Sequence, residues 1–389
     1  HPQIRQLMGT QKHVERKPSN GPDWCLLSLR EHKQGLLMQV WATVEVAGGQ
    51  PCPQQRADSI IWPGQTTPMT HEIANAQLSG GYVFLDDRFL EKYEQSAFYD
   101  TVPVKIGEAW FCSPSYKGQW DFTECVRVGR NLIKVPMREL YKPKPDREIL
   151  HARRYARSPE EMRQIDRDAE HIVEKTQRLL DQILALGDHL SLLGQSVGLD
   201  KTGNALTGFS RAELLRNGWM AYPNLCKLAQ VAPLDMTQQA FLSRCKQIHE
   251  ILQPIPDGYL KSLLAAAGCP RAKIKDLKLL KLLEALLNIV QRLNKDEEAL
   301  DAFASQQEPE GWNQRHPAMA PLFLNNDLRI ADAHEAVGQC IQTLQTMGLD
   351  SATLNDGYGL ALDFVLDRII GCLETLNTAL EQFLERSAP

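Results

Sequence analysis

Hydrophobic and polar positions alternate in the first part of the chain. Between residues 36 and 46 the alternation has period two, which is typical of a strand with one face on a core. The expected core face comprises Leu36, Met38, Val40, Ala42, Val44 and Val46. Gly48 and Gly49 end this strand. The pattern further predicts strands at 82–85, 102–112 and 122–128, a short helix at 87–95, and a hairpin within 126–137.

The pattern changes to helical spacing after Ser158. Ser158 as N-cap, Pro159 at the first helical position and Glu160 and Glu161 in the first turn form a helix start. The hydrophobic spacing that follows predicts helices at 159–187, 210–230, 237–252, 257–267, 273–294, 316–346 and 357–386.

Two of these helices carry distinctive patterns. The segment 273–294 is apolar nearly all round, which predicts a central, buried helix. The last helix has apolar residues spaced alternately by four and three, as in the seam of a coiled coil. The seam comprises Leu362, Leu366, Ile369, Leu373, Leu376, Leu380 and Phe383. It either packs within its own bundle or pairs with a second copy of the chain.

These elements predict an α+β protein, with a strand-rich N-terminal domain followed by an all-α helical bundle. At 389 residues the chain is long enough for two domains. The expected divisions are a loose lead-in at 1–22, a β-rich domain at 23–142, a basic linker at 143–157 and a helical domain at 158–389.

Composition narrows the class of protein. Hydrophobic residues make up 43% and charged residues 23% of the chain, as in ordinary globular proteins, and the net charge of −5 argues against a protein that coats nucleic acid over its whole surface. The chain lacks an apolar run long enough for a membrane helix, so no membrane contact is expected. Its nine cysteines form no C-x-x-C pair, which favours reduced core residues in the cytoplasm.

Several catalytic and metal-binding motifs are missing. The sequence contains no phosphate-binding G-x-x-x-x-G-K-[ST] loop, no G-x-S-x-G elbow and no H-E-x-x-H zinc motif. Asp86 and Asp87 could hold a metal as paired carboxylates, but two acids after a strand are more often a turn or a helix cap. No metal site and no cofactor are therefore expected.

One segment is strongly basic. Between residues 127 and 157, ten basic residues stand against three acidic ones, a net charge of +7. The basic residues are Arg127, Arg130, Lys134, Arg138, Lys142, Lys144, Arg147, Arg153, Arg154 and Arg157. Such a patch could bind a phosphate backbone through charge and counterion release. Alternatively, the segment is a solvated linker whose charges pair with the acidic start of the next helix.

A second constellation lies at Arg329 and His334, behind the polar entry Asn325-Asn326-Asp327. Here the chain resembles the HEPN superfamily, whose ribonuclease members are helical bundles with an R-x(4–6)-H motif near their C-terminal end. The resemblance covers at most residues 155–389. A second stretch with the same spacing is Arg244 to His249.

The spacing sets a geometric condition on this pair. Five residues of helix turn by about 500°, which leaves Arg329 and His334 about 140° apart if one helix carries both. Either Arg329 sits at a helix start, or a second protomer supplies one member of the site, as in the composite sites of that family. Without a catalytic role, Arg329 would pair with Asp332 and His334 would be a buried structural histidine.

The resemblance implies a metal-independent endoribonuclease, of the kind found in bacterial toxins and antiviral defence. His334 would be the general base toward a ribose 2′-hydroxyl, and Arg329 would bind the phosphate. Asp332, Glu335 and Asn326 would support them, the basic segment would guide RNA, and the chain would form a homodimer. The alternative is a non-catalytic helical scaffold with a β-rich recognition module, working as a subunit of a larger assembly.

Overall fold

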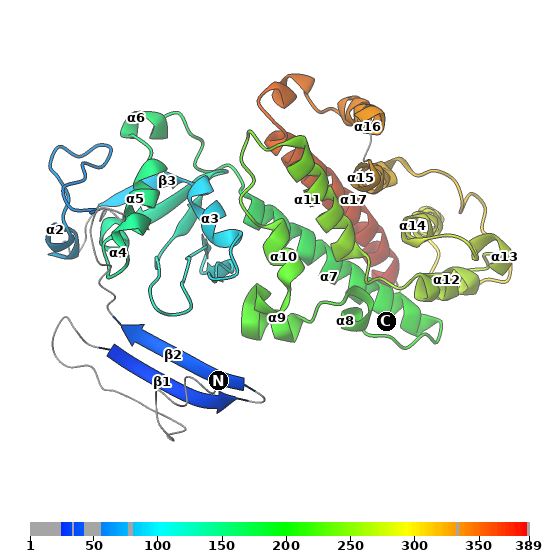
Figure 1. Ribbon diagram of the computed structural model, residues 1–389. Coiled ribbons are helices and arrows are strands. Elements are labelled where there is room, and N and C mark those ends of the chain that lie inside the picture. The colour runs from blue at the N-terminus through cyan, green and yellow to red at the C-terminus, as the bar shows by residue number, and fades with distance from the viewer. Residues whose placement is uncertain (1–24, 33–34, 43–55, 77–80, 332–333, 387–389) are drawn as a thin grey trace. The chain divides into compact units, whose positions relative to one another are not determined.

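The computed structural model describes residues 25–32, 35–42, 56–76, 81–331 and 334–386 (Figure 1). The chain divides into two compact units, His1–Arg56 and Ala57–Pro389. In the first unit, β1 (Cys25–His32) pairs antiparallel with β2 (Gly35–Ala42), with Cys25 opposite Ala42. The strand expected at 36–46 is therefore β2 up to Ala42, and positions 43–46 lie outside the described residues.

The second unit begins with a five-stranded antiparallel sheet of order β3-β7-β6-β5-β4. Its strands are β3 (Tyr82–Asp86), β4 (Val104–Ile106), β5 (Ala109–Phe111), β6 (Val126–Val128) and β7 (Leu132–Pro136). The predicted hairpin at 126–137 is confirmed as β6 and β7. Its turn requires Gly129, which has a φ of +55° and lies so close to the backbone of Asp166 that a Cβ would be 2.5 Å from the carbonyl oxygen.

Short helices pack around this sheet. They are α2 (His71–Ala76), η1 (Asp87–Leu90), α3 (Glu91–Glu94), α4 (Met137–Leu140) and α5 (Asp146–Arg154). The short helix predicted at 87–95 is confirmed as η1 and α3. The segment 143–157, expected to be a linker, instead contains α5, which buries Ile149 and Ala152 in the core. Residues 57–157 are called the sheet part below.

The remainder, residues 158–386, is the helical part. Its first helices are α6 (Pro159–Met162), α7 (Ile172–Ser196), α8 (Gly203–Thr207), α9 (Arg211–Asn217), η2 (Gly218–Ala221), α10 (Pro223–Leu228) and α11 (Gln238–Leu252). They are followed by α12 (Asp257–Ala266), α13 (Arg271–Ile274), α14 (Leu279–Lys295), η3 (Leu300–Phe303), η4 (Pro317–Met319), α15 (Ala320–Ile330), α16 (His334–Thr346), η5 (Ser351–Asn355) and α17 (Gly359–Glu385). The predicted α+β class is confirmed.

Three of the expected helices are interrupted. The predicted start at Ser158 is confirmed, since its side chain and that of Glu161 form a capping box, but α6 ends at Met162 and α7 begins only after His171. Between them, Arg167 lies over the ring of Phe84 of the sheet, so tertiary contacts replace the helix there. The expected helix 210–230 breaks at Gly218, whose φ is +56°, and the expected helix 316–346 breaks after Ile330.

The long helices α7 and α17 pack along each other, and Figure 1 shows them crossing the helical part together with α11. All seven residues of the predicted seam on α17 are buried in this one chain. The interpretation that the seam packs within its own bundle is therefore correct. Because these seven side chains are buried within one chain, they offer no exposed surface to a second copy, and the homodimer stays a prediction.

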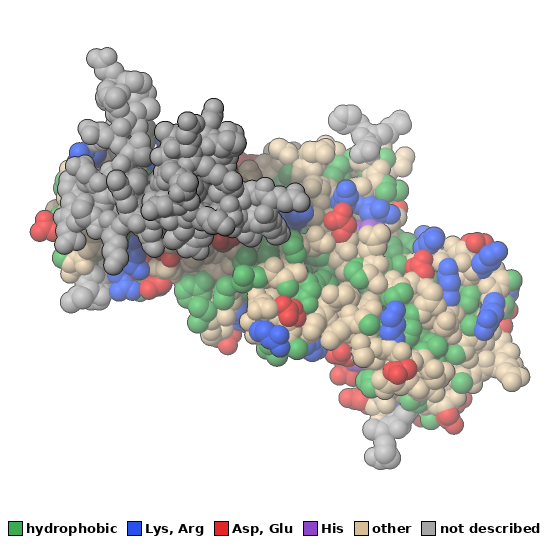
Figure 2. Space-filling view, turned by 60° about the horizontal axis from the view of Figure 1, so that its bottom comes forward, with side chains coloured by type: hydrophobic (Ala, Val, Ile, Leu, Met, Phe, Trp, Pro, Cys, Tyr) green, Lys and Arg blue, Asp and Glu red, His purple; other side chains and the backbone are tan. Residues whose placement is uncertain are grey.

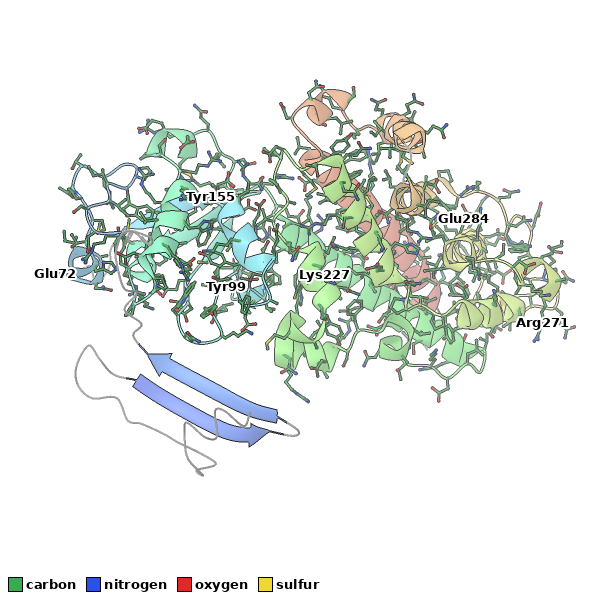
Figure 3. All side chains as sticks on the ribbon, in the orientation of Figure 1. Glu72, Tyr99, Tyr155, Lys227, Arg271 and Glu284 are labelled. Carbon is green, nitrogen blue, oxygen red and sulfur yellow. The ribbon has the colours of Figure 1, made fainter. Side chains whose placement is uncertain are left out.

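The predicted central helix at 273–294 is confirmed as α14, which is mostly buried and packs on α12 and α17, but α14 begins only at Leu279 and residues 275–278 are not helical. One buried residue on it is charged, namely Glu284, which is labelled in Figure 3. Its carboxylate accepts hydrogen bonds from Lys281 Nζ at 2.7 Å and from the backbone N–H of His316 at 3.0 Å. A buried carboxylate is thus paired, as burial requires.

The sheet part and the helical part are joined by polar contacts. Glu94 accepts a hydrogen bond from the backbone N–H of Val231 at 2.8 Å, and Arg130 Nε lies 2.5 Å from Asp363 Oδ2 on α17. The compact units consequently divide at Arg56, not at the expected boundary near residue 157. In the described part of the chain, none of the helices combines the length and the apolar character needed to cross a membrane.

Candidate functional site

Arg329 and His334 lie on two different helices. Arg329 is in the last turn of α15, and His334 is the first residue of α16. Ala331 already leaves the helix, with a ψ of 85°. The predicted single helix is therefore wrong here, and so is the alternative in which Arg329 lies at a helix start. The 140° divergence of one continuous helix does not apply to this pair.

The guanidinium of Arg329 is exposed and is oriented by its own helix. Its Nε donates a hydrogen bond to Asn326 Oδ1, one turn earlier, at 3.0 Å. Asn326 therefore positions Arg329, while its predicted supporting role in catalysis stays a prediction. Asp332 and the side chains of His334 and Glu335 lie outside the described residues. The remaining predicted contacts of this site stay predictions.

The structure brings a different histidine close to Arg329. Helix α11 packs on α15, where Asn325 Nδ2 donates to the carbonyl oxygen of Cys245 at 3.1 Å. His249, one turn further along α11, is half-buried. Burial lowers the pKa of His249, and the positive charge of Arg329 lowers it further. At neutral pH this imidazole is therefore mainly uncharged and able to accept a proton, and it lies within electrostatic range of an exposed guanidinium.

The sequence offered both residues but not their combination. Arg329 belongs to one match to the R-x4-H motif and His249 to another, and the two residues are eighty positions apart in the sequence. The partner of His249 in its own match, Arg244, is buried. Arg244 donates to the backbone carbonyl oxygens of Leu228 at 2.6 Å and Val231 at 3.0 Å. It thus stabilises the end of α10 and cannot contact a phosphate.

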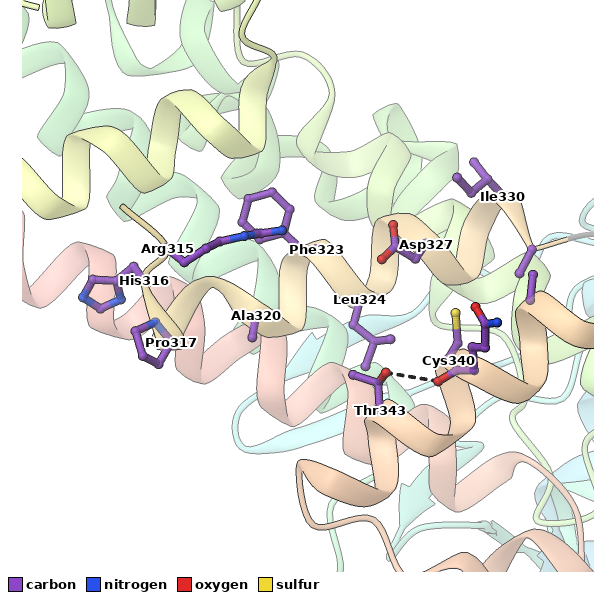
Figure 4. A pocket seen from close by; sticks show the side chains of 13 residues that line it. Arg315, His316, Pro317, Ala320, Phe323, Leu324, Asp327, Ile330, Cys340 and Thr343 are labelled. Carbon is purple, nitrogen blue, oxygen red and sulfur yellow. Dashed lines mark hydrogen bonds between the residues drawn. The ribbon is translucent and has the colours of Figure 1, made fainter. Parts of the chain in front are cut away.

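A groove of about 600 Å³ runs between α15 and α16. Figure 4 shows Arg315 and Phe323 near one end and Ile330 at the other, close to the break that follows α15. The guanidinium carbon of Arg315 lies 4.2 Å from the centroid of the Phe323 ring, and Lys281 Nζ lies 4.9 Å from it. Among these, Phe323, Arg315 and the carboxylate of Asp327 line the groove, whereas Lys281 is paired with Glu284 and is not one of its lining residues.

Most of the predicted basic segment is already paired inside the protein. The side chain of Arg127 is fully buried, with Nη1 2.7 Å from Asp87 and Nη2 3.3 Å from Glu94. Its assignment as a nucleic-acid contact is wrong, because a buried guanidinium cannot reach a phosphate. Arg130 is likewise largely buried against Asp363.

Lys144 is a third member of the segment that faces inward. Its Nζ donates to the carbonyl oxygen of Glu139 at 2.6 Å, and burial lowers its pKa to about 8. The other paired members are Arg138 with Glu124, Lys142 with Glu139, Arg147 with Glu148, Arg157 with Asp86 and Glu161, and Lys134 over the ring of Tyr82.

The segment is thus neither the solvated linker nor the continuous patch that the sequence suggested. Its side chains pair mainly with carboxylates of the sheet part, and only Arg157 reaches the predicted acidic helix start, at Glu161. Arg147 and Arg154 remain exposed, and Arg153 Nε donates to the carbonyl oxygen of Ile61 at 3.1 Å. These three are the members best placed to meet an anionic partner.

The predicted acidic pair Asp86-Asp87 has a structural role. Asp86 caps η1 by accepting a hydrogen bond from the backbone N–H of Arg88 at 3.0 Å, as the cap interpretation predicts. Burial raises the pKa of Asp87, which is paired with Arg127. Among the described residues no group of three or more His, Cys, Asp or Glu side chains could hold a metal ion. Seven described cysteines are free thiols, six of them buried.

Comparison with known proteins adds no relative. No protein-family model, curated protein or solved structure matches this chain.

Proposed function

We propose that the chain is a metal-independent ribonuclease whose site lies at the break between α15 and α16. The observation that carries the proposal is the exposed Arg329, held by Asn326, with His249 on the adjacent helix α11 within electrostatic range of its guanidinium. Five residues after Arg329, α16 begins with His334. The helix break removes the divergence that one helix would impose, so Arg329 and His334 need no second protomer to converge.

The chemistry needs one proton acceptor and one phosphate-binding cation. A neutral imidazole removes the proton of a ribose 2′-hydroxyl, and the 2′-oxygen attacks phosphorus. The bond from phosphorus to the 5′-oxygen breaks, and that oxygen takes a proton from an imidazolium or from water. The products are a 2′,3′-cyclic phosphate and a 5′-hydroxyl. Arg329 stabilises the negative charge on the phosphoryl oxygens as the transition state forms.

Two histidines compete for the role of base. His334 is favoured by the resemblance to HEPN ribonucleases, whereas His249 is favoured by the lowered pKa that keeps its imidazole neutral. RNA is the expected partner, and the groove beside Phe323 offers a place for a flanking base, since aromatic rings and nearby cations suit unpaired nucleotides. A toxin or antiviral defence role follows from the resemblance alone.

The test is cleavage of single-stranded RNA by the full chain in the presence of a chelator. Arg329→Ala should lower the rate by about 10²–10³-fold through lost charge stabilisation. Alanine at the true base should lower it by about 10²–10⁴-fold. Comparing His334→Ala with His249→Ala identifies that base, and Lys246→Ala, on the exposed side of α11, is the matched control.

Melting temperatures separate a lost catalytic group from a damaged fold. Arg329→Ala and Lys246→Ala should melt like the wild type, since both side chains are exposed, and a histidine variant counts as catalytic only where its melting temperature is unchanged. If the wild type leaves RNA intact, or if Arg329→Ala cleaves at the wild-type rate, the ribonuclease proposal is wrong. Products ending in a 3′-hydroxyl would also contradict it, because they exclude attack by the 2′-oxygen.

A second candidate function is that of a non-catalytic interaction subunit. Two observations support it. Most basic side chains of the segment 127–157 form ion pairs within the protein, and large apolar side chains are exposed on α9 and η2. On this proposal the wild type cleaves no RNA under any condition, and substitutions at Arg329 and both histidines have no effect on binding to its assembly.

A further inference from the structure

A cleft of about 690 Å³ lies between the β4–β5 hairpin, α7 and the α9–η2 segment. Trp110 and Trp219 line it, with ring centroids 5.1 Å apart and planes inclined by 46°. Leu180 and Leu184 of α7 complete its apolar lining. Lys105 pairs across the strands with Trp110, so both side chains share one face of the sheet, the face on the cleft.

The mouth of the cleft is unusually apolar for a surface. The side chains of Leu215 and Met220 line it and are 89% and 72% exposed, more than any other large hydrophobic residue among those described. Helix α9, which carries Leu215, buries none of its residues. On the face of the molecule shown in Figure 2, hydrophobic side chains gather near the middle of the view. Contiguous exposed apolar surface of this kind marks interaction sites.

The charges on the rim have one sign. Lys105, Arg211 and Arg216 line the cleft, and no carboxylate is among its described lining residues. Arg211 is paired with Asp188 at 2.7 Å, whereas Lys105 lies 3.8 Å from the fully exposed Glu108 and within electrostatic range of Glu174 and Asp181 on α7. Arg216 forms no ion pair within the described residues. Arg216 is therefore free to meet an anionic partner, and Lys105, which is only loosely paired, lies on the same rim.

We propose that this cleft docks a segment of a partner protein that presents large apolar side chains flanked by carboxylates. A small apolar molecule could fill the cleft but would leave Leu215 and Met220 in water, whereas a protein segment covers both. Buried apolar anchors supply the binding energy, and carboxylates beside Lys105 and Arg216 supply specificity and faster association. The site is formed by the β4–β5 hairpin, α7, α9 and η2, and is therefore separate from the break after α15.

The test uses the full chain and two pools of short fluorescein-labelled peptides. One pool mixes Leu, Phe and Glu in random order, and in the other Lys replaces Glu. Fluorescence anisotropy should show binding of the acidic pool only, weakening as salt rises. Leu215→Glu should weaken binding by about tenfold or more, and Arg216→Glu should weaken it and reduce its salt dependence.

Matched controls come from other surfaces of the same unit. Ile73→Glu introduces a charge at another exposed apolar position, and Lys278→Glu reverses another exposed lysine. Both should bind the acidic pool like the wild type. Because Leu215 and Arg216 are exposed, their variants should keep the wild-type melting temperature.

Four results of the binding assay would overturn the proposal. They are failure of the acidic pool to bind, equal binding of the basic pool, wild-type binding by Leu215→Glu, and complete displacement of the peptides by a fatty acid such as dodecanoate. A dimer that light scattering detects in the wild type but not in Leu215→Glu would also overturn it, since a second copy would then be the occupant.

Discussion

At the scale of single residues, the main finding is that a basic sequence segment does not have to produce a basic surface. Arg127 illustrates this, since its guanidinium is enclosed by Asp87, Glu94 and the Cys112 thiol, 3.4 Å from Nε. The carboxylates come from η1 and α3, more than thirty residues away in sequence. The net charge of +7 over 127–157 consequently for the most part does not appear at the surface, because carboxylates from other elements pair with most of these basic side chains.

We predict that Arg127→Leu is strongly destabilising. It leaves Asp87 and Glu94 buried without their counter-charge, which costs about 3–5 kcal/mol of unfolding free energy. Chemical denaturation followed by circular dichroism would measure the change. Arg147→Leu is the matched control, because Arg147 is 69% exposed and its pair with Glu148 should contribute about 1 kcal/mol or less. Equal stability of the two variants would show that the buried pair is not required.

A second residue-scale prediction concerns His171, the N-cap of α7. Its Nδ1 accepts a hydrogen bond from the backbone N–H of Glu174 at 3.2 Å. Burial, and then the charge of Arg127, lower the pKa of His171 from 6.5 to about 3. The unfolded chain therefore binds a proton that the folded chain excludes, and stability is lost as the pH falls from about 6.5 toward about 3.

His171→Asn tests this pH dependence, because asparagine keeps an N-cap acceptor but does not titrate. The decrease in melting temperature from neutral pH to about pH 4.5 should be smaller for the variant than for the wild type. An identical acid-induced decrease in both proteins would show that His171 does not contribute to it.

At the scale of elements, periodic patterns were reliable and helix boundaries were not. The alternating spacing of four and three on α17 corresponds to a fully buried face, from Leu362 to Phe383. By contrast, α15 and α16 read as one helix in the sequence. The break follows Ile330, where Ala331 adopts a non-helical ψ. No glycine or proline marks that position, so no local signal predicted it.

We predict that the α17 seam stabilises the single chain. Leu373→Ala removes a fully buried side chain and should lower the unfolding free energy by about 2–5 kcal/mol. Leu360→Ala, on the same helix but 39% exposed, should cost distinctly less. Light scattering should give both variants the same mass as the wild type. A change of oligomeric state in Leu373→Ala alone would mean that the seam lies between two chains.

At the scale of the whole molecule, the sheet part and the helical part form one compact unit. Gln230 Nε2 donates to the carbonyl oxygen of Glu94 at 3.1 Å, and Arg88 Nη1 lies 3.0 Å from Asp235. The paired rings of Trp110 and Trp219 add an apolar contact between the two parts. Separate domains joined by a linker would lack this combination of contacts.

We therefore predict that residues 57–389 unfold in a single transition, as one cooperative unit. Scanning calorimetry of that fragment should show one peak, with a calorimetric enthalpy equal to the van't Hoff enthalpy. The fragment 158–389 should melt at a lower temperature, because it loses the contacts of Trp219, Val231 and Asp363 with the sheet part. Two resolved transitions in residues 57–389 would support the domain boundary that the sequence suggested.

The sequence by itself determined the features that depend on neighbouring positions. The α+β class, the helix start at Ser158, the turn at Gly129 and the apolar faces of α14 and α17 all follow from residues a few positions apart. Capping, positive φ and hydrophobic spacing act over one or two turns, so they are readable before the chain folds.

Only the tertiary structure decided which charges and side chains meet. Arg127 forms an ion pair with Glu94, Arg130 forms one with Asp363, and Arg329 lies within electrostatic range of His249. These partners are separated by 33, 233 and 80 positions, and no local pattern links them. Burial and ion pairing depend on the packing of whole elements. For this reason most of the basic segment does not form the predicted basic surface, and the histidine near Arg329 comes from outside its own R-x4-H motif.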